Sequence, residues 1–225
     1  MKDTLTVGAL LDLSKTLAAS LFEGALYPWD VLDGIGDFIL ALGPTLPKEE
    51  FDNPAENVWI AKDAQVAPTA SITGPCIIDH GAQVRHCAFI RGKAIVGKNA
   101  VVGNSTELKN ALLFDNVQVP HFNYVGDSVL GYKAHMGAGS ITSNVKSDKT
   151  NVVIKTSAEP VVTGRRKLGA ILGDYCEVGC NAVLCPGTVL GRNTTVYPTT
   201  CVRGAIEENS IVKNTGAVIV KRPQE

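Results

Sequence analysis

The sequence predicts an all-β solenoid, a parallel β-helix of hexapeptide repeats, preceded by an α-helical N-terminal extension. An aliphatic residue recurs at every sixth position from Ile60 to Leu108, and again from Leu172 to Val202. A helix repeats about every 3.6 residues and a strand every second residue, so neither explains this period. A solenoid with three six-residue faces per coil does, because each face points one aliphatic side chain inward. Residues about eighteen apart then share a column, about 4.8 Å from coil to coil.

Residues 1–56 are the predicted extension, because they lack the six-residue period. Apolar residues between Leu10 and Leu26, and between Val31 and Leu42, have the spacing of two short amphipathic helices. A Pro-Trp pair separates the two helices, and Gly43-Pro44 ends the second. We expect both helices to bury their apolar faces on the solenoid or on a neighbouring subunit.

Residues 57–215 are the predicted solenoid, followed by a C-terminal tail over 216–225. Two inward steps are five residues long instead of six, from Leu108 to Leu113 and from Val125 to Leu130. Residues 140–170 have no period but are rich in lysine and arginine, so they form a loop excursion. Long loops in compact domains are usually functional.

Composition excludes several classes of function. The charges nearly balance, with a formal net charge of −1, and this gives no sign of nucleic-acid or anionic-membrane partners. Asp12 and Lys15 interrupt the N-terminal apolar stretch, and no stretch approaches the roughly 20 apolar residues of a membrane span. The six cysteines contain no Cys-x-x-Cys pair and are expected to be reduced thiols. We expect a cytoplasmic protein.

The period also brings polar residues together. His86, Asn104, His121 and Ala138 fall in one column, and Arg91 and Lys109 fall in another. Two cations about 5 Å apart repel each other. They therefore either bind an anion such as phosphate or splay apart in solvent, and spacing alone leaves both open. An imidazole base beside the exposed amides of a Gly-Ala-Gly stretch, with an anion clamp nearby, indicates acyl transfer.

The residues around these columns carry a family resemblance. The matching stretches are Phe89-Ile90-Arg91, Gly103-Asn104, Glu107-Leu108-Lys109, Pro120-His121 through Asp127, and Met136 through Asn144. They resemble the left-handed β-helical acetyltransferase half of the bacterial bifunctional N-acetylglucosamine-1-phosphate uridyltransferases. The stretch from Thr163 to Ala170 is similar to archaeal sugar-1-phosphate nucleotidylyltransferases that end in such a domain.

The resemblance implies a homotrimeric N-acetyltransferase of UDP-N-acetylglucosamine biosynthesis, with active sites between subunits. Acetyl-CoA would be the donor and an amino-sugar 1-phosphate, such as glucosamine 1-phosphate, the acceptor, with no metal in the site. Its roles carry over to matching positions here: His121 as the base, Arg91 and Lys109 on the phosphate, Tyr124, Asn144 and His135 on the sugar, and Ala138, Cys180 and Pro198 on coenzyme A. At His135 the family usually has asparagine.

Residues 1–52 could not supply a nucleotide-binding domain. We therefore expect no pyrophosphorylase or uridyltransferase activity, which a separate nucleotidylyltransferase protein could provide. Two alternatives stay open. One is a non-catalytic sugar-phosphate-binding or trimerisation module. The other is a metal lyase similar to γ-class carbonic anhydrases, but its zinc needs three imidazoles. His86 and His121 are two coils apart, roughly 9–10 Å, so one subunit alone could not build that site.

Overall fold

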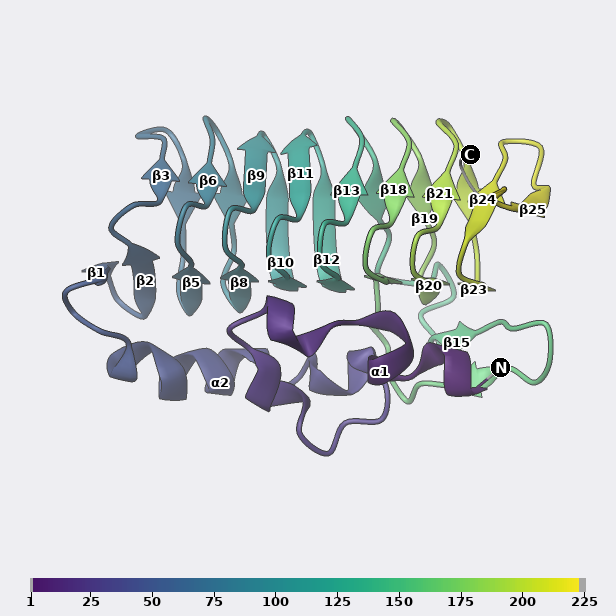
Figure 1. The fold of residues 1–225 in the computed structure, drawn as a ribbon, viewed down its shortest axis with the longest axis horizontal. Coiled ribbons are helices and arrows are strands. Elements are labelled where there is room, and N and C mark those ends of the chain that lie inside the picture. Colours follow the sequence, from purple (N-terminus) through teal and green to yellow (C-terminus); the bar gives the residue numbers. More distant parts are fainter. Residues whose placement is uncertain (1, 223–225) are drawn as a thin grey trace.

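The computed structural model describes residues 2–222, and these form a left-handed parallel β-helix with a helical layer along one side (Figure 1). The strands stack on three faces of a prism. Face 1 contains β2 (Val58–Ala61), β5 (Cys76–Ile78), β8 (Ala94–Val96), β17 (Ala170–Leu172), β20 (Thr188–Leu190) and β23 (Ala205–Ile206). Face 2 contains β4 (Ser71–Ile72), β7 (Phe89–Ile90), β14 (Ile141–Thr142), β19 (Val183–Leu184) and β22 (Cys201–Val202).

Face 3 forms a separate sheet. It contains β3 (Gln65–Val66), β6 (Gln83–Val84), β9 (Val101–Asn104), β11 (Gln118–His121), β13 (His135–Met136), β18 (Glu177–Val178), β21 (Thr195–Val196) and β24 (Ser210–Val212). Two longer strands, β10 (Glu107–Leu113) and β12 (Tyr124–Leu130), pass from face 2 to face 1 and join these faces into one sheet. Antiparallel strands lie at the two ends of the prism: β1 (Phe51–Ala55) pairs with β2, and β25 (Val218–Val220) pairs with β24.

The six-residue period is confirmed as the origin of the core. Ile60, Ile78 and Val96 are successive partners in parallel register, eighteen residues apart. The five-residue steps are also real, since Leu113 and Leu130 are completely buried. Both steps occur where β10 and β12 turn a corner through one residue in the left-handed conformation, Asn110 with φ of 51° and Asp127 with φ of 48°.

The N-terminal extension differs in part from its prediction. The second helix is confirmed as α2 (Ile35–Leu42), but the first predicted helix is wrong. Instead of one longer helix, this part of the chain contains the short α1 (Val7–Leu10) and several 3₁₀ turns. The 3₁₀ turns of the whole extension are η1 (Lys2–Leu5), η2 (Leu13–Lys15), η3 (Ala19–Phe22), η4 (Pro28–Val31) and η5 (Gly43–Thr45). The Asp12 carboxylate accepts from the Ser14 N–H and the Thr16 hydroxyl from the Ala18 N–H. Such local bonds compete with helical ones.

The extension packs along face 1 and lies under its strands in Figure 1. Phe22 meets Phe114 edge-on with ring centres 5.9 Å apart, and α2 contacts β5, β8 and β10. The Asp174 carboxylate accepts a 2.8 Å hydrogen bond from the Asp12 N–H. No helix in the described residues is long and apolar enough to cross a membrane. The contacts of Phe22 and α2 show that the extension packs on the solenoid, which is the first of the two expected arrangements.

The excursion folds back onto the prism. The coil of the prism stays regular through β14, and the chain then leaves the prism. An isolated bridge between Val145 and Lys167 joins the two ends of the segment that projects from it. Within this segment β15 (Val153–Ile154) and β16 (Val161–Val162) form an antiparallel hairpin. Ile154 is completely buried. The basic residues that follow the hairpin are therefore held against the corner between faces 1 and 2.

Candidate active site

One corner of the prism brings together the predicted base and the predicted coenzyme contacts. Asn104, His121, Ala138, Cys180 and Pro198 stack there, and we call this column the His121 edge. From Asn104 to Cys180, the carbonyl of each column residue accepts a hydrogen bond of 2.8–3.0 Å from a backbone N–H of the coil that follows. The column expected from residue spacing is confirmed as far as Ala138. It continues beyond the excursion to Cys180 and Pro198.

The His121 imidazole is exposed and makes no hydrogen bond to any residue between 2 and 222. The other three histidines are all engaged. His80 bonds Asp63 and Glu50, His86 bonds Thr69 at 2.9 Å, and His135 bonds Glu177 at 2.8 Å. The His121 backbone is nevertheless held, because its N–H donates to Asn123 Oδ1 at 3.1 Å. His121 thus combines a fixed backbone with a ring that makes no hydrogen bond within the described chain.

Backbone N–H groups next to His121 are available as donors. The Ala138 N–H has no hydrogen-bond acceptor among the described residues, and neither has the Cys180 N–H one coil further. Gly137 keeps this stretch tightly stacked, since a Cβ there would lie 2.7 Å from the Cys180 nitrogen. Free amides beside an imidazole can stabilise negative charge on a carbonyl oxygen.

The predicted cation pair is differently arranged from either expectation. Arg91 and Lys109 do lie in adjacent coils, but each has a carboxylate partner of its own. Arg91 Nη1 is 2.6 Å from Glu107 Oε1, and Lys109 Nζ is 2.9 Å from Asp127 Oδ1. The Glu107 hydrogen bond and charge raise the pKa of Arg91. The two cations therefore neither splay apart in solvent nor depend on an external anion to offset their repulsion.

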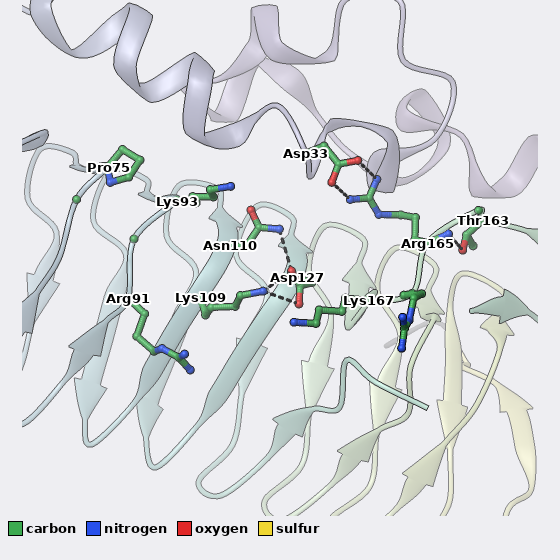
Figure 2. Close-up of a pocket in the computed structure, with 14 residues that line it drawn as sticks. Asp33, Pro75, Arg91, Lys93, Lys109, Asn110, Asp127, Thr163, Arg165 and Lys167 are labelled. Carbon is green, nitrogen blue, oxygen red and sulfur yellow. Dashed lines mark hydrogen bonds and ion pairs between the residues drawn. The ribbon is translucent and has the colours of Figure 1, made fainter. Parts of the chain in front are cut away.

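Asp127 joins the sugar and phosphate residues of the sequence prediction into one network. Its buried carboxylate accepts from Lys109 Nζ and from Asn110 Nδ2 at 2.9 Å (Figure 2). It also accepts from Asn144 Nδ2 at 2.5 Å. Asn144 Nδ2 also lies 3.2 Å from the Tyr124 hydroxyl. Burial, and then the Asp127 charge, raise the pKa of Tyr124. Asp127 ends one of the sequence motifs that carry the family resemblance, but the motif alone assigns it no role. The five-residue step at Asp127 was the available signal.

A basic cavity of about 710 Å³ opens beside this network. Two acidic side chains line it, Asp33 and Asp127. Six basic side chains line it: Arg91, Lys93, Lys109, Arg165, Arg166 and Lys167. Asp33 reaches it from the N-terminal extension and binds Arg165 through two bonds of 3.0 and 2.5 Å (Figure 2). The sequence showed the basic run after the hairpin, but only the fold brings it to Arg91 and Lys109.

His135 lies apart from this network. It is on β13 of face 3, level with Gln118, and its ring bonds Glu177. No hydrogen bond in the described chain joins it to Asp127 or Asn144. Nor do the described residues contain a group of three His, Cys, Asp or Glu side chains that could hold a metal ion.

Comparison with known proteins supports the resemblance found in the sequence. The GMPPB C-terminal domain family matches residues 72–164. The bifunctional protein GlmU of Methanococcus maripaludis is 35% identical over 216 residues, covering 87% of this chain and 48% of that protein. The bifunctional sugar-1-phosphate nucleotidylyltransferase/acetyltransferase of Sulfurisphaera tokodaii is 34% identical over 94 residues, 42% of this chain and 23% of that one.

The chain thus spans about half or less of the length of these relatives. Among solved structures, a hexapeptide transferase family protein from Anaplasma phagocytophilum aligns with a TM-score of 0.42 and 15% identity, over 74% of this chain and 81% of that one. The solenoid is homologous to part of the GlmU-type and sugar-1-phosphate nucleotidylyltransferase proteins, as the motifs predicted.

Proposed function

We propose that this relative of the GlmU-type proteins is an N-acetyltransferase that uses acetyl-CoA and an amino sugar with a phosphate on its anomeric carbon. One observation carries the proposal: the free imidazole of His121 lies one coil from the unpaired N–H of Ala138. Two relatives add support, since one is a bifunctional sugar-1-phosphate nucleotidylyltransferase/acetyltransferase and the other a bifunctional GlmU protein.

In the proposed reaction His121 accepts a proton from the sugar amine as the nitrogen attacks the thioester carbonyl. A C–N bond forms, the C–S bond breaks, and the proton passes through the imidazole to the departing thiolate. The Ala138 N–H donates to the carbonyl oxygen while that oxygen gains negative charge. A general base of this kind contributes about 10²- to 10⁴-fold to the rate.

The donor would lie along the His121 edge. Ala138, Cys180 and Pro198 follow one another at the coil spacing of about 4.8 Å. Cys180 and Pro198 are exposed, and the Cys180 N–H is unpaired in the described chain. An extended pantetheine chain could run past them. In a homotrimer a neighbouring subunit would form the other wall of this groove.

The acceptor would cross face 2 from the His121 edge toward the basic cavity. Along β11 and β12 the order is His121, then Tyr124, then Gly126, which is level with Lys109. With this order, an acceptor whose amine lies at the imidazole would reach Arg91 and Lys109 with its phosphate. Tyr124 and Asn144 would bind sugar hydroxyls, with Asp127 positioning Asn144 and Lys109.

The test is a thiol-release assay with acetyl-CoA and a panel of amino-sugar 1-phosphates and 6-phosphates. We expect turnover of a 1-phosphate, and a fall of about 10²- to 10⁴-fold in the His121→Ala variant. His86→Ala is the matched control, because His86 is in the same predicted column, two coils away, and its ring is bound to Thr69.

Turnover of 6-phosphates alone would refute the orientation of the acceptor. Equal losses in the two variants would refute the role of His121. No transfer with any acceptor, together with binding of a sugar phosphate, would favour a non-catalytic binding module.

A further inference from the structure

We infer that the basic cavity binds the second phosphate of a diphosphate, so that the acceptor is an amino sugar linked to a nucleoside diphosphate. This inference rests on the proposed function for the identity of the acceptor. Arg91, Lys109 and Asp127, which belong to the proposed acceptor site, line one part of the cavity, and the rest of its lining has no role in the proposed reaction.

The charges show which groups are free to bind. Arg91, Lys109 and Arg165 are each paired with a carboxylate. Lys93, Arg166 and Lys167 have no carboxylate partner in the part of the chain that the structure describes, yet all three line the same cavity. The Lys167 side chain points toward Lys109 and Asp127 (Figure 2). Once a first phosphate is bound by Arg91 and Lys109, these three cations remain for a second.

Two polar atoms of the lining are also left without partners. Asn110 Oδ1 and Arg165 Nε are buried and make no hydrogen bond within the described residues. A buried polar atom without a partner is destabilising. One of these atoms is an acceptor and the other a donor.

The position of the cavity gives the direction of the ligand. Lys93 follows Arg91 by two residues, on the side of the corner away from face 2. An acceptor whose amine is at His121 reaches Arg91 and Lys109 with its first phosphate. Anything attached to that phosphate then continues toward Lys93, Arg166 and Lys167. A cavity of about 710 Å³ is within the range of roughly 300–1,000 Å³ that holds drug-sized ligands, more than a terminal phosphate would fill.

The first arm of the experiment measures binding of inorganic pyrophosphate and inorganic phosphate to the full chain by calorimetry. We expect pyrophosphate to bind at least about tenfold more tightly than phosphate. The double variant Arg166→Gln/Lys167→Gln should lose about tenfold or more in pyrophosphate affinity, because each lost cation removes a charge-assisted contact. The matched control is Lys48→Gln/Arg203→Gln, which removes the same two charges at exposed positions away from the cavity.

The second arm compares thiol release with glucosamine 1-phosphate and with UDP-glucosamine. The inference predicts a kcat/KM at least about tenfold higher for the nucleotide-linked sugar, and loss of that preference in the cavity variant. Equal binding of phosphate and pyrophosphate, or equal losses in both double variants, would overturn it. Absence of transfer from every acceptor, with pyrophosphate binding intact, would refute the proposed function and the acceptor assignment but keep the diphosphate cavity.

Discussion

Replacing Asp127 with asparagine tests whether one buried carboxylate holds the acceptor site together. The carboxylate accepts two bonds from Lys109, of 2.9 and 3.1 Å, one from Asn110 and one from Asn144. An asparagine in its place has one acceptor oxygen and an NH₂ group. That NH₂ would face the amide donor of either Asn110 or Asn144, and Lys109 would lose its counter-charge.

The expected cost follows from burial. Removing one partner of a buried ion pair costs about 3–5 kcal/mol. Lys109 is 27% exposed, so water offsets part of this loss, and we expect about 2–3 kcal/mol. A chain of this size loses about 2–4 °C in Tm per kcal/mol, so Asp127→Asn should lower Tm by about 4–12 °C.

The kinetic effect separates positioning from simple destabilisation. Lys109 and Asn144 would lose their fixed places, so the KM for the acceptor should rise about tenfold or more. The KM for acetyl-CoA should stay unchanged, because no residue of the His121 edge forms a hydrogen bond with Asp127 within the described part of the chain. Thermal unfolding and steady-state thiol release measure the two effects.

Asp148→Asn is the control, since Asp148 and its partner Lys146 form an exposed pair. Such a pair contributes about 0–1 kcal/mol, so Tm should change by no more than about 4 °C. If Asp127→Asn left both Tm and the acceptor KM at wild-type values, the network would have no part in holding the site. If only kcat fell while the acceptor KM kept its wild-type value, a general loss of folded protein would explain the result.

Two further substitutions test the solenoid itself. Asp79 is buried with Oδ2 unpaired among the described atoms, and burial raises its pKa, so the ionised carboxylate costs stability above that pKa. Asp79→Asn should therefore raise Tm near neutral pH, and the gain should vanish as the pH falls through the raised pKa; a gain that grew toward acid would contradict this. At Gly103 a Cβ would lie 1.6 Å from the Pro120 carbonyl oxygen of the next coil. Gly103→Ala should cost about 3 kcal/mol or more in chemical denaturation, whereas Gly8→Ala, with open space around it, should cost nothing.

The β-helix was predictable because its period is a local property of the chain. One aliphatic residue must point inward on each face, so the pairing of Ile78 with Val96 can be predicted from their spacing in the sequence. The same period predicted that His121 lies beside Ala138 and Arg91 beside Lys109, since residues separated by one full coil fall in the same column. Backbone geometry alone sets these relations, and no long-range contact is needed to infer them.

The hydrogen-bond and ion-pair partners of the site's side chains could not be predicted from residue spacing. Asp33 and Arg165 are 132 residues apart and meet only because the extension and the excursion fold over the same corner. The first predicted helix was wrong because Asp12 and Thr16 bond their own neighbours, a choice that apolar spacing does not reveal. The ion pairs of Arg91 and Lys109 likewise depend on which way long side chains turn.

The two irregular steps of the period mark the site more directly than the regular ones. A corner made by one residue needs a positive φ, which asparagine and aspartate tolerate better than most residues. Asn110 and Asp127 occupy these corners in adjacent coils, so their side chains stack and bond at 2.9 Å. Asparagines stack at another corner as well, where Asn193 donates to Asn209 at 2.8 Å. Of these two stacked pairs in the described chain, the Asn110–Asp127 pair contains a carboxylate and the Asn193–Asn209 pair does not, and that charge holds Lys109. A break in a repeat that changes an amide into an acid is therefore the place to look for chemistry in such a solenoid.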